Sequence, residues 1–465
     1  MKKMIRMKCS DIVRSNLSSK SIGLLPLLIL VFALGSNLYA QEKITDTNTP
    51  LHLIQPDYPV PYGEIRQEET QEVLNRVYGY LKEVTPAGLV EGETNTLVKD
   101  ISIASQDAVL AQGDFRLLSY EWGVTYAGML AAAEATGEDK FKEYTFDRLS
   151  FLNELYHHYG SKTLSREKSS PIEKVLNPHA LDDAGAMCAA IIKAREAGID
   201  VDMTPIVDNF IDFIINKQYR LKDGTLARNR PLINTLWLDD LFMSVPALAQ
   251  MGKLSGEMMY FDEATKQVEL FSERMFNAEK GIYMHGWVEG AESFPEFHWG
   301  RANGWAFMTL VELLDVLPKE HPKYDKMMSY FLAHAKGLAQ YQSGSGFWHQ
   351  LIDREDSYLE TSATAIYTYC YAKAINNGWL DYRVFGPLTI LGWTAVATKV
   401  NEKGQVEGTC VGTGMGFDPG FYYYRPVNVY AAHGYGPVLL AGAEIIKMLN
   451  NSPFQIDETA VQFSE

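Results

Sequence analysis

Two pairs of adjacent aspartates have the spacing and surroundings of an acid–base site. Asp182 and Asp183 open one apolar run, and Asp239 and Asp240 open another directly after Trp237 and Leu238. An ionised carboxylate is costly to bury unless it is paired or functional, although an aspartate also caps a helix N-terminus favourably. Both interpretations stay open for each pair taken alone. Two carboxylates that face one pocket can take different pKa values, so that one donates a proton while the other stays ionised.

A second set of residues has the types that bind an acidic sugar. Trp299 and Trp305 offer flat faces for stacking, and Arg301 between them offers a fork of N–H donors that suits a carboxylate. His285 lies in a long aromatic segment, and His298 precedes the first tryptophan. A loop-to-helix junction with buried tryptophans and a structural ion pair would explain the same residues, so this alternative also stays open.

Helical periodicity predicts the elements that position these residues. About twelve runs after residue 65 carry apolar residues at three- and four-residue steps. We expect helices to start near Glu68, Glu121, Asp139, Asp182, Pro205, Asp239, Phe261, Ala302, Lys323, Thr361, Arg383 and Gly434.

Turn signals between these runs recur about every sixty residues. Gly137, Gly198, Gly256, Pro322 and Gly378 are 61, 58, 66 and 56 residues apart. A repeat of this length holds two helices, so the sequence predicts an all-α fold, an (α/α)6 barrel of about twelve helices in six hairpins. An open solenoid is the alternative. We expect the site on the face that gathers the long segments 220–236, 277–299, 344–358 and 406–428.

The first forty residues have the pattern of a signal peptide. Six lysines and arginines precede or flank an apolar run from Ile22 to Leu34, and a small-residue stop follows near Ala40. We therefore expect a signal peptide over 1–40, a single catalytic domain over 41–465, and a secreted or periplasmic protein without a membrane span after cleavage. An uncleaved N-terminal anchor is the alternative.

Charge and cysteine content exclude several classes of function. Without residues 1–40, 36 Lys and Arg stand against 57 Asp and Glu, a net charge of −21, which is incompatible with non-specific nucleic-acid binding. An anionic ligand would need a local cationic pocket. Cys188, Cys370 and Cys410 are odd in number and widely spaced, which argues against a disulfide framework or a zinc site.

Four motifs occur in an order that points to a known family. They are Trp237-Leu238-Asp239-Asp240-Leu241-Phe242-Met243, His285-Gly286-Trp287, Trp299-Gly300-Arg301-Ala302-Asn303-Gly304-Trp305 and Tyr358-Leu359-Glu360-Thr361-Ser362-Ala363. Together they resemble glycoside hydrolase family 105, the unsaturated rhamnogalacturonyl hydrolases, a family related to family 88. The likeness runs from about Tyr120 to Leu449.

This resemblance implies an (α/α)6 barrel that removes a 4,5-unsaturated uronic acid from the non-reducing end of lyase-generated oligosaccharides, with no cofactor and no metal. It implies the general acid/base at Asp239. The second acid is expected within the pair Asp182 and Asp183, with Asp183 favoured because it precedes Ala184 and Gly185. Substrate contacts are expected at Tyr120, His285, Trp299, Arg301 and Trp305, with Asp182, Trp237 and His298 beside them.

The implied chemistry is hydration of the C4=C5 double bond. Asp239 would donate a proton to C4 and then activate the water that adds at C5, so one acid serves both steps. We expect the apolar neighbours Trp237 and Phe242 to keep Asp239 protonated. The chain departs from the family at Val288, where an acid often follows the His-x-Trp motif, which leaves the sugar and its linkage undefined.

Three other functions use the same residues. A conventional inverting glycosidase or a polysaccharide lyase could be built on the same barrel, and a non-catalytic glycan-binding protein would also explain the aromatic residues. The parent polysaccharide could be pectic, ulvan-like or an arabinogalactan.

Overall fold

The computed structural model describes residues 44–51, 54, 58–61, 63, 65–105, 107–160, 170–451, 454–457 and 460–463. The chain divides into two units, Met1–Leu51 and His52–Glu465. The described part of the first unit, 44–51, is a short turn, and the expected signal peptide lies outside the described residues. Within the described residues, no helix combines the length and apolar character needed to cross a membrane.

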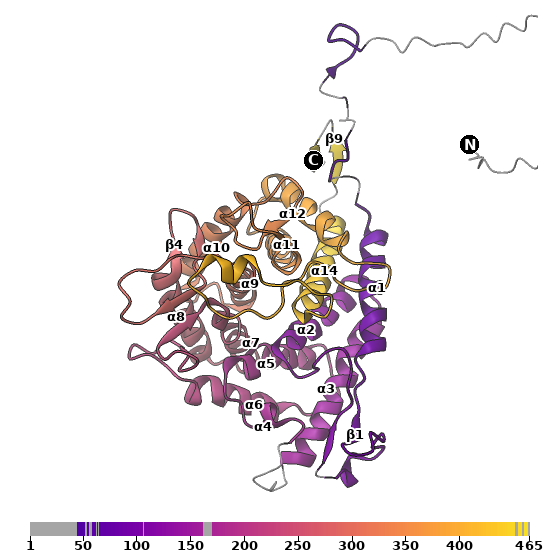
Figure 1. Ribbon diagram of the computed structural model, residues 1–465, viewed down its shortest axis with the longest axis vertical. Coiled ribbons are helices and arrows are strands. Elements are labelled where there is room, and N and C mark those ends of the chain that lie inside the picture. Colours follow the sequence, from indigo (N-terminus) through magenta and orange to yellow (C-terminus); the bar gives the residue numbers. More distant parts are fainter. Residues whose placement is uncertain are drawn as a thin grey trace, which may run out of the picture. The chain divides into compact units, whose positions relative to one another are not determined.

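Six helices form the inner wall of a closed ring in the second unit. They are α2 (Tyr120–Thr136), α5 (Leu181–Glu196), α7 (Val245–Ser255), α9 (Gly300–Val316), α11 (Thr361–Asn376) and α14 (Tyr435–Asn451). Each contacts the next in this order, and α14 contacts α2, which closes the ring (Figure 1). The predicted barrel is confirmed, and closure excludes the open solenoid.

Six outer helices pack against this wall, one for each inner helix. They are α1 (Gln67–Val84), α3 (Asp139–Gly160), α6 (Thr204–Asp212, continued by the π-helical η3, Phe213–Lys217), α8 (Met258–Met275), α10 (Tyr324–Ala339) and α12 (Tyr382–Ala397). The outer helix α1 buries one stripe that includes Val73, Val77 and Leu81, whereas α5 and α9 are buried on nearly every side. This difference is what a double ring of helices requires.

Small residues allow the first and last inner helices to touch. A Cβ at Gly128 would lie 2.9 Å from the carbonyl oxygen of Gly436, and a Cβ at Gly436 would lie 2.7 Å from the backbone nitrogen of Thr125. Any larger side chain at these two positions would separate α2 from α14 and open the ring.

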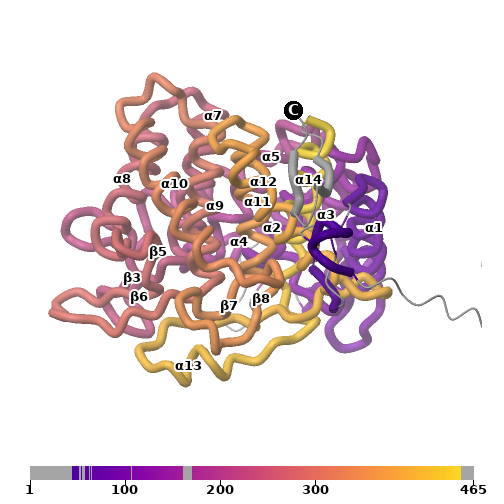
Figure 2. The backbone as a smooth tube through the Cα atoms, turned by 90° about the horizontal axis from the view of Figure 1, so that it is seen from above, coloured from indigo at the N-terminus to yellow at the C-terminus, as the bar shows by residue number. Residues whose placement is uncertain are grey.

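Short elements occupy the connections, mostly at one end of the ring. They are β3 (Thr235–Trp237), η4 (Leu238–Leu241), β6 (Gly286–Val288), β7 (Trp348–His349), β8 (Leu359–Glu360), α13 (Pro419–Tyr423) and η5 (Ala432–Gly434). Antiparallel pairs join β3 to β6 and β7 to β8. Figure 2 shows these strands and α13 at the same end, which gathers four long connections that approach from different parts of the chain.

The remaining short elements lie elsewhere in the chain. They are β1 (Leu89–Glu91), η2 (Ile101–Ile103), β2 (Ala108–Leu110), α4 (Glu173–Leu176), β4 (Phe276–Asn277), β5 (Ile282–Tyr283), β9 (Phe454–Asp457) and β10 (Ala460–Phe463). β1 pairs with β2, β4 with β5 and β9 with β10, each antiparallel.

Candidate active site

The two aspartate pairs meet at the end of the ring where the inner helices begin. One pair lies in the first turn of α5, and the other lies in η4, which leads into the neighbouring helix α7. The start of α5 touches the segment between η4 and α7, because a Cβ at Gly185 would lie only 1.8 Å from the carbonyl oxygen of Met243. The pairs therefore share one end of the ring, as their spacing in the sequence predicts.

Asp239 is held against His285 by the register of a two-stranded sheet. β3 and β6 pair so that Trp237 lies opposite Gly286, which brings the residue before Gly286 level with η4. The His285 Nε2 atom lies 2.9 Å from Asp239 Oδ2, and its Nδ1 atom lies 2.7 Å from the hydroxyl of Tyr422. The imidazole is fully buried, while Asp239 keeps 14% of its side chain exposed. This exposed part is where a substrate can reach the carboxyl group.

The pKa of Asp239 differs from the expectation drawn from the sequence. Burial raises this pKa, but the charge and hydrogen bond of His285, together with Arg228, outweigh burial and hold the pKa below its usual value. The expectation that Trp237 and Phe242 keep Asp239 protonated is therefore wrong, because polar neighbours dominate over the apolar ones. The proton that a general acid needs has a second place in this pair, on the imidazole of His285.

Arg228 joins the two aspartate pairs, and no sequence motif singled it out. Its Nε atom donates to Asp240 Oδ2 (2.9 Å), its Nη2 atom donates to Asp240 Oδ1 (2.6 Å), and Nη2 also donates to Asp182 Oδ2 (3.2 Å). The guanidinium carbon lies 4.0 Å from the ring centre of Trp237. The sequence could have indicated that some cation lies here, because neighbouring carboxylates are stable in a partly buried site only when they are paired with positive charge.

Asp182 points into the space shared with Asp239. Burial raises the pKa of Asp182 to about 6, against the opposing charge of Arg228 and with further increases from Asp240 and Asp239. Its side chain is 32% exposed, so it is open to a ligand. Asp182 thus has the position and the electrostatic coupling expected of a second acid.

Asp183, the residue favoured from the sequence, is engaged in a different set of contacts. Its carboxylate lies 3.0 Å from Lys174 Nζ and accepts hydrogen bonds from the backbone nitrogen (3.2 Å) and Nδ1 (3.1 Å) of His179. Burial raises its pKa, but these hydrogen bonds outweigh burial and lower it. Asp183 therefore closes the start of α5 in the manner of a helix cap, and the geometry favours Asp182 as the partner of Asp239.

Tyr120, the first residue of α2, lies on the other side of α5 from the η4 aspartates and within electrostatic range of Asp182. Its hydroxyl is 2.5 Å from Nε2 of His433, which precedes α14. Tyr120 and Asp182 together border a cavity of about 840 Å³ that extends away from the acids along the segment 110–121. Other residues that line it include Arg116, Glu121, Ser170, Glu173 and Lys174. The cavity has room for several sugar rings beside the acids.

Arg301 is closely engaged with the protein itself. Its side chain is 1% exposed, and it donates to the carbonyl oxygens of Cys410 and Val411 (2.7 Å each) and to the hydroxyl of Ser362 (3.2 Å). The expected role as a free fork for a carboxylate does not fit these contacts. Arg301 instead fixes the start of the segment 410–424 and contributes positive charge near Asp239.

The two tryptophans of the same motif lie behind the site. Trp299 is buried and packs on His285, with ring centres 4.7 Å apart. Trp305 is buried and stacks on Phe242 at 4.9 Å, directly after the η4 acids. Neither ring offers an open face to a sugar, so the expected sugar stacking does not fit the structure. The two tryptophans instead hold His285 and Phe242 in place beside Asp239.

His298 belongs to a separate buried cluster. Its Nδ1 atom is 3.0 Å from the carbonyl oxygen of Tyr283, and its Nε2 atom is 3.1 Å from Nζ of Lys280, which also donates to Asp353. Burial lowers the pKa of His298. These contacts leave His298 as a structural residue rather than the expected substrate contact.

The segment 412–424 covers the acids from outside the ring. A Cβ at Gly414 would lie 3.2 Å from the Trp237 ring, and a Cβ at Gly286 would lie 2.2 Å from Sδ of Met415. Tyr422 of α13 completes the cover through its contact with His285. The long glycine-rich connection predicted to carry part of the site thus does so, although its contribution through Tyr422 was not foreseen.

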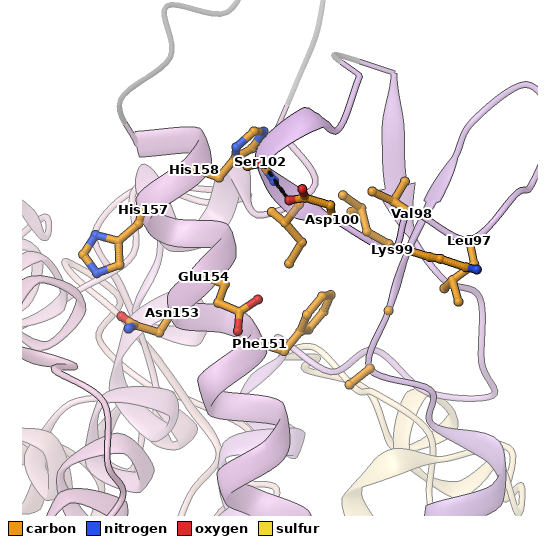
Figure 3. Close-up of a pocket in the computed structure, with 14 residues that line it drawn as sticks. Leu97, Val98, Lys99, Asp100, Ser102, Phe151, Asn153, Glu154, His157 and His158 are labelled. Carbon is orange, nitrogen blue, oxygen red and sulfur yellow. Dashed lines mark hydrogen bonds between the residues drawn. The ribbon is translucent and has the colours of Figure 1, made fainter.

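A larger cavity, about 1180 Å³, lies away from the acids. It is lined by α3 and by residues 87–89 and 97–102. Figure 3 shows Phe151 and Glu154 of α3 pointing toward the segment that carries Lys99 and Asp100. None of the aspartates described above is among its lining residues, so it is distinct from the candidate site.

The chain is similar to known proteins both in sequence and in fold. The model of Glycosyl Hydrolase Family 88 matches residues 95–449. An unsaturated 3S-rhamnoglycuronyl hydrolase of Alteromonas sp. (strain LOR) is 28% identical over 285 residues, which is 58% of this chain and 67% of the relative. An unsaturated rhamnogalacturonyl hydrolase of Bacillus subtilis (strain 168) is 24% identical over 337 residues, or 71% and 90%.

A solved structure shares the fold. It is that of a possible member of family GH105 from Klebsiella pneumoniae subsp. pneumoniae MGH 78578, with a TM-score of 0.67 and 23% identity, over 87% of this chain and 98% of that one.

Proposed function

The chain belongs to Glycosyl Hydrolase Family 88, and on that premise we propose that it removes a 4,5-unsaturated uronic acid from the non-reducing end of lyase-generated oligosaccharides. The two relatives described above are named as an unsaturated 3S-rhamnoglycuronyl hydrolase and an unsaturated rhamnogalacturonyl hydrolase. The observation that carries the proposal is the placement of Asp239, which is hydrogen-bonded to buried His285 and close enough to Asp182 and Arg228 for their charges to interact.

This arrangement suits hydration of a vinyl ether. A proton passes from the Asp239–His285 pair to C4 of the sugar, and positive charge develops as an oxocarbenium ion at C5. Water then adds its oxygen to C5 and returns a proton to Asp239, so the acid is regenerated. The hemiketal at C5 opens to a ketone by breaking the bond from C5 to the ring oxygen, which becomes a hydroxyl on C1. The resulting hemiacetal at C1 collapses to an aldehyde and releases the glycan as an alcohol.

Asp182 has a separate part in this proposal. Facing Asp239 from α5, it can accept a hydrogen bond from a sugar hydroxyl or from the attacking water, and Arg228 keeps it oriented. Its ionised form stabilises the developing positive charge. A conventional glycosidase uses one carboxylic acid on the leaving oxygen and attacks C1 instead, which makes the two reactions separable by experiment.

The test follows the ultraviolet absorbance of the conjugated enoate in an unsaturated disaccharide. Loss of the band with release of the second sugar supports the proposal. A gain of absorbance on an intact polysaccharide would establish a lyase, and sugar release from saturated oligosaccharides without any change in absorbance would establish a conventional glycosidase. Binding without turnover would make the protein a glycan-binding module.

The parent polysaccharide is the finer part of the proposal. Pectic, ulvan-like and arabinogalactan polysaccharides each yield unsaturated oligosaccharides after lyase treatment, and the 840 Å³ cavity beside Tyr120 and Asp182 is where their remaining sugars would lie. Assaying a panel of the three lyase digests ranks them by kcat/KM.

Export is a further part of the proposal. The pattern of residues 1–40 supports a cleaved signal peptide and a secreted or periplasmic enzyme. N-terminal sequencing of protein recovered outside the cytoplasm tests it, and an N-terminus at Met1 would contradict it.

A further inference from the structure

Tyr422 lies where the covering segment touches the acid pair. It is the fourth residue of α13, and its ring is buried between Phe297 and Phe421, with ring centres 5.3 and 5.0 Å away. Its hydroxyl has three partners: Nδ1 of His285 at 2.7 Å, and both the carbonyl oxygen (3.0 Å) and the backbone nitrogen (3.1 Å) of Gly416.

Counting protons assigns a role to each partner. A phenol has one proton to donate and two lone pairs that accept. The Gly416 carbonyl only accepts and the Gly416 N–H only donates, so the hydroxyl donates to that carbonyl and accepts from that nitrogen. The remaining lone pair then accepts from His285 Nδ1, which must carry a proton to make the 2.7 Å contact. This arrangement alone places a proton in each of the three contacts, because a phenol that donated to Nδ1 would leave none for the Gly416 carbonyl.

The same count fixes what lies between His285 and Asp239. With Nδ1 protonated, the 2.9 Å contact between Nε2 and Asp239 Oδ2 requires one more proton, either on the imidazole or on the carboxyl group. In the other neutral tautomer, Nε2–H would satisfy an ionised Asp239 and no transferable proton would remain. The direction of the Tyr422 hydroxyl proton therefore decides whether the Asp239–His285 pair holds a proton that it can transfer.

We propose that Tyr422 is a positioning residue that sets the tautomer of His285, so that the Asp239–His285 pair holds one transferable proton while the segment 412–424 is seated over the site. The inference rests on the proposed function, in which that proton goes to C4. Gly414 lies against Trp237 and Met415 against Gly286, so the segment that carries Tyr422 is anchored on β3 and β6.

Other charged groups around the pair decide where the proton rests. Arg228 faces Asp239 and favours its ionised form. The negative charges of Asp240 in η4 and Asp182 in α5 disfavour the ionised form of Asp239, whereas Arg301 in α9 favours it. Tyr120 in α2 and Asp418 beside α13 also lie close enough to interact with the Asp239–His285–Tyr422 cluster. A bound carboxylate adds negative charge and shifts the proton toward Asp239.

Burial raises the pKa of Tyr422 far above neutrality, so the phenol keeps its proton throughout the working range. Its role is therefore to orient a hydrogen bond, and it does not titrate itself.

The test compares Tyr422→Phe with Tyr423→Phe, the same change at the next residue, whose hydroxyl bonds Asp356 outside the site. Phenylalanine keeps the ring packing and removes only the hydroxyl. We expect the alkaline limb of kcat for Tyr422→Phe to move down by about one pH unit, with kcat about 10-fold lower above that limb. KM should stay within about 2-fold, and Tyr423→Phe should match the parent protein. A uniform loss at all pH values, or an unchanged profile, overturns the proposal.

A second measurement does not depend on turnover. Nitrogen-15 NMR of the histidine rings at neutral pH, with His285→Gln to identify the signal, reports which nitrogen carries the proton. We expect Nδ1 protonation in the parent protein and a shift to the Nε2–H form in Tyr422→Phe. A neutral imidazole with Nε2–H alone in the parent protein, or the same protonation pattern in both proteins, contradicts the inference even if the enoate is hydrolysed. Failure of the parent protein to consume the enoate refutes the proposed function instead.

Discussion

Replacing Asp182 with Asn and, in a second protein, Asp183 with Asn makes one chemical change at two adjacent positions with different surroundings. Asp182 faces Asp239 and Arg228, so we expect Asp182→Asn to lower kcat/KM by about 10²- to 10³-fold. Asp183 is bound to Lys174 and His179 on the side of α5 that closes its first turn. Asp183→Asn should therefore keep kcat/KM within about 3-fold.

The two changes should affect stability in opposite directions. The pKa of Asp182 is about 6 in the folded chain against an ordinary 3.8, which corresponds to at most about 3 kcal/mol at about 1.4 kcal/mol per unit. Because the side chain is partly exposed, we expect about 1 kcal/mol. A raised pKa favours folding below pH 4, and that advantage is lost as the pH rises through 6. Asp182→Asn should therefore raise the melting temperature at pH 8, and the gain should vanish by pH 4.

The pKa of Asp183 shifts in the opposite direction, so its effect on stability has the opposite pH dependence. Its pKa is lowered in the folded chain, so its ionised form contributes stability above its ordinary value, and this contribution is lost as the pH falls through the folded pKa. Asp183→Asn should lower stability by about 1 kcal/mol at pH 8, through loss of the ion pair with Lys174 and weakened closure of α5.

Thermal unfolding at pH 4 and pH 8, combined with kcat/KM on an unsaturated disaccharide, measures all four effects on the same proteins. An Asp183→Asn protein that folds normally but is inactive, beside a nearly active Asp182→Asn protein, would refute this reasoning. It would restore Asp183 as the second acid, as the order of residues in the sequence suggested.

Three further predictions concern the elements that hold the acids. Asp239→Asn should lower kcat by at least about 10³-fold while circular dichroism and melting temperature stay near the parent values; near-normal turnover would end the assignment. Arg228→Lys should lower kcat/KM by about 10- to 100-fold, since a lysine cannot bridge both aspartate pairs, and an unchanged rate constant would show that charge alone suffices. Gly185→Ala should destabilise the protein by several kcal/mol in chemical denaturation, because its Cβ would overlap the Met243 carbonyl, whereas Gly79→Ala, with open space around it, should not.

The sequence predicted the helices well because their periodicity is a local property. Starts expected at Asp139 and Thr361 coincide with the first residues of α3 and α11. The exception is the run expected to start at Asp239, which is a short 3₁₀ turn followed by α7 from Val245. Pro246 explains the break, since a proline is tolerated in the first turn of a helix and not inside it.

The functional side chains were harder to predict because their orientation depends on contacts distant in sequence. Asp182 and Asp183 differ by about 100° around α5, and this inner helix is buried on nearly every side, so its apolar pattern does not show which face points to the acids. Arg228 and Tyr422 come from connections without a regular pattern, and only the fold brings them to η4 and β6. Trp305 and His298 are of residue types common in sugar-binding sites, but in the structure both are buried and contact only other protein groups.

A chain of formal charge −16 that acts on an anionic sugar has to manage repulsion at the site itself. Asp182, Asp239 and Asp240 gather there with Arg228 and Arg301, and both guanidinium groups already donate to protein atoms. A carboxylate that enters this balance raises the proton affinity of its neighbours. Under the proposed reaction, the negative charge of the substrate therefore favours the protonated form of Asp239, from which C4 can receive the proton. The charge that opposes binding thus favours protonation of the acid, and the hydrogen bond that the imidazole donates to Tyr422 of the covering segment keeps the transferable proton within the pair.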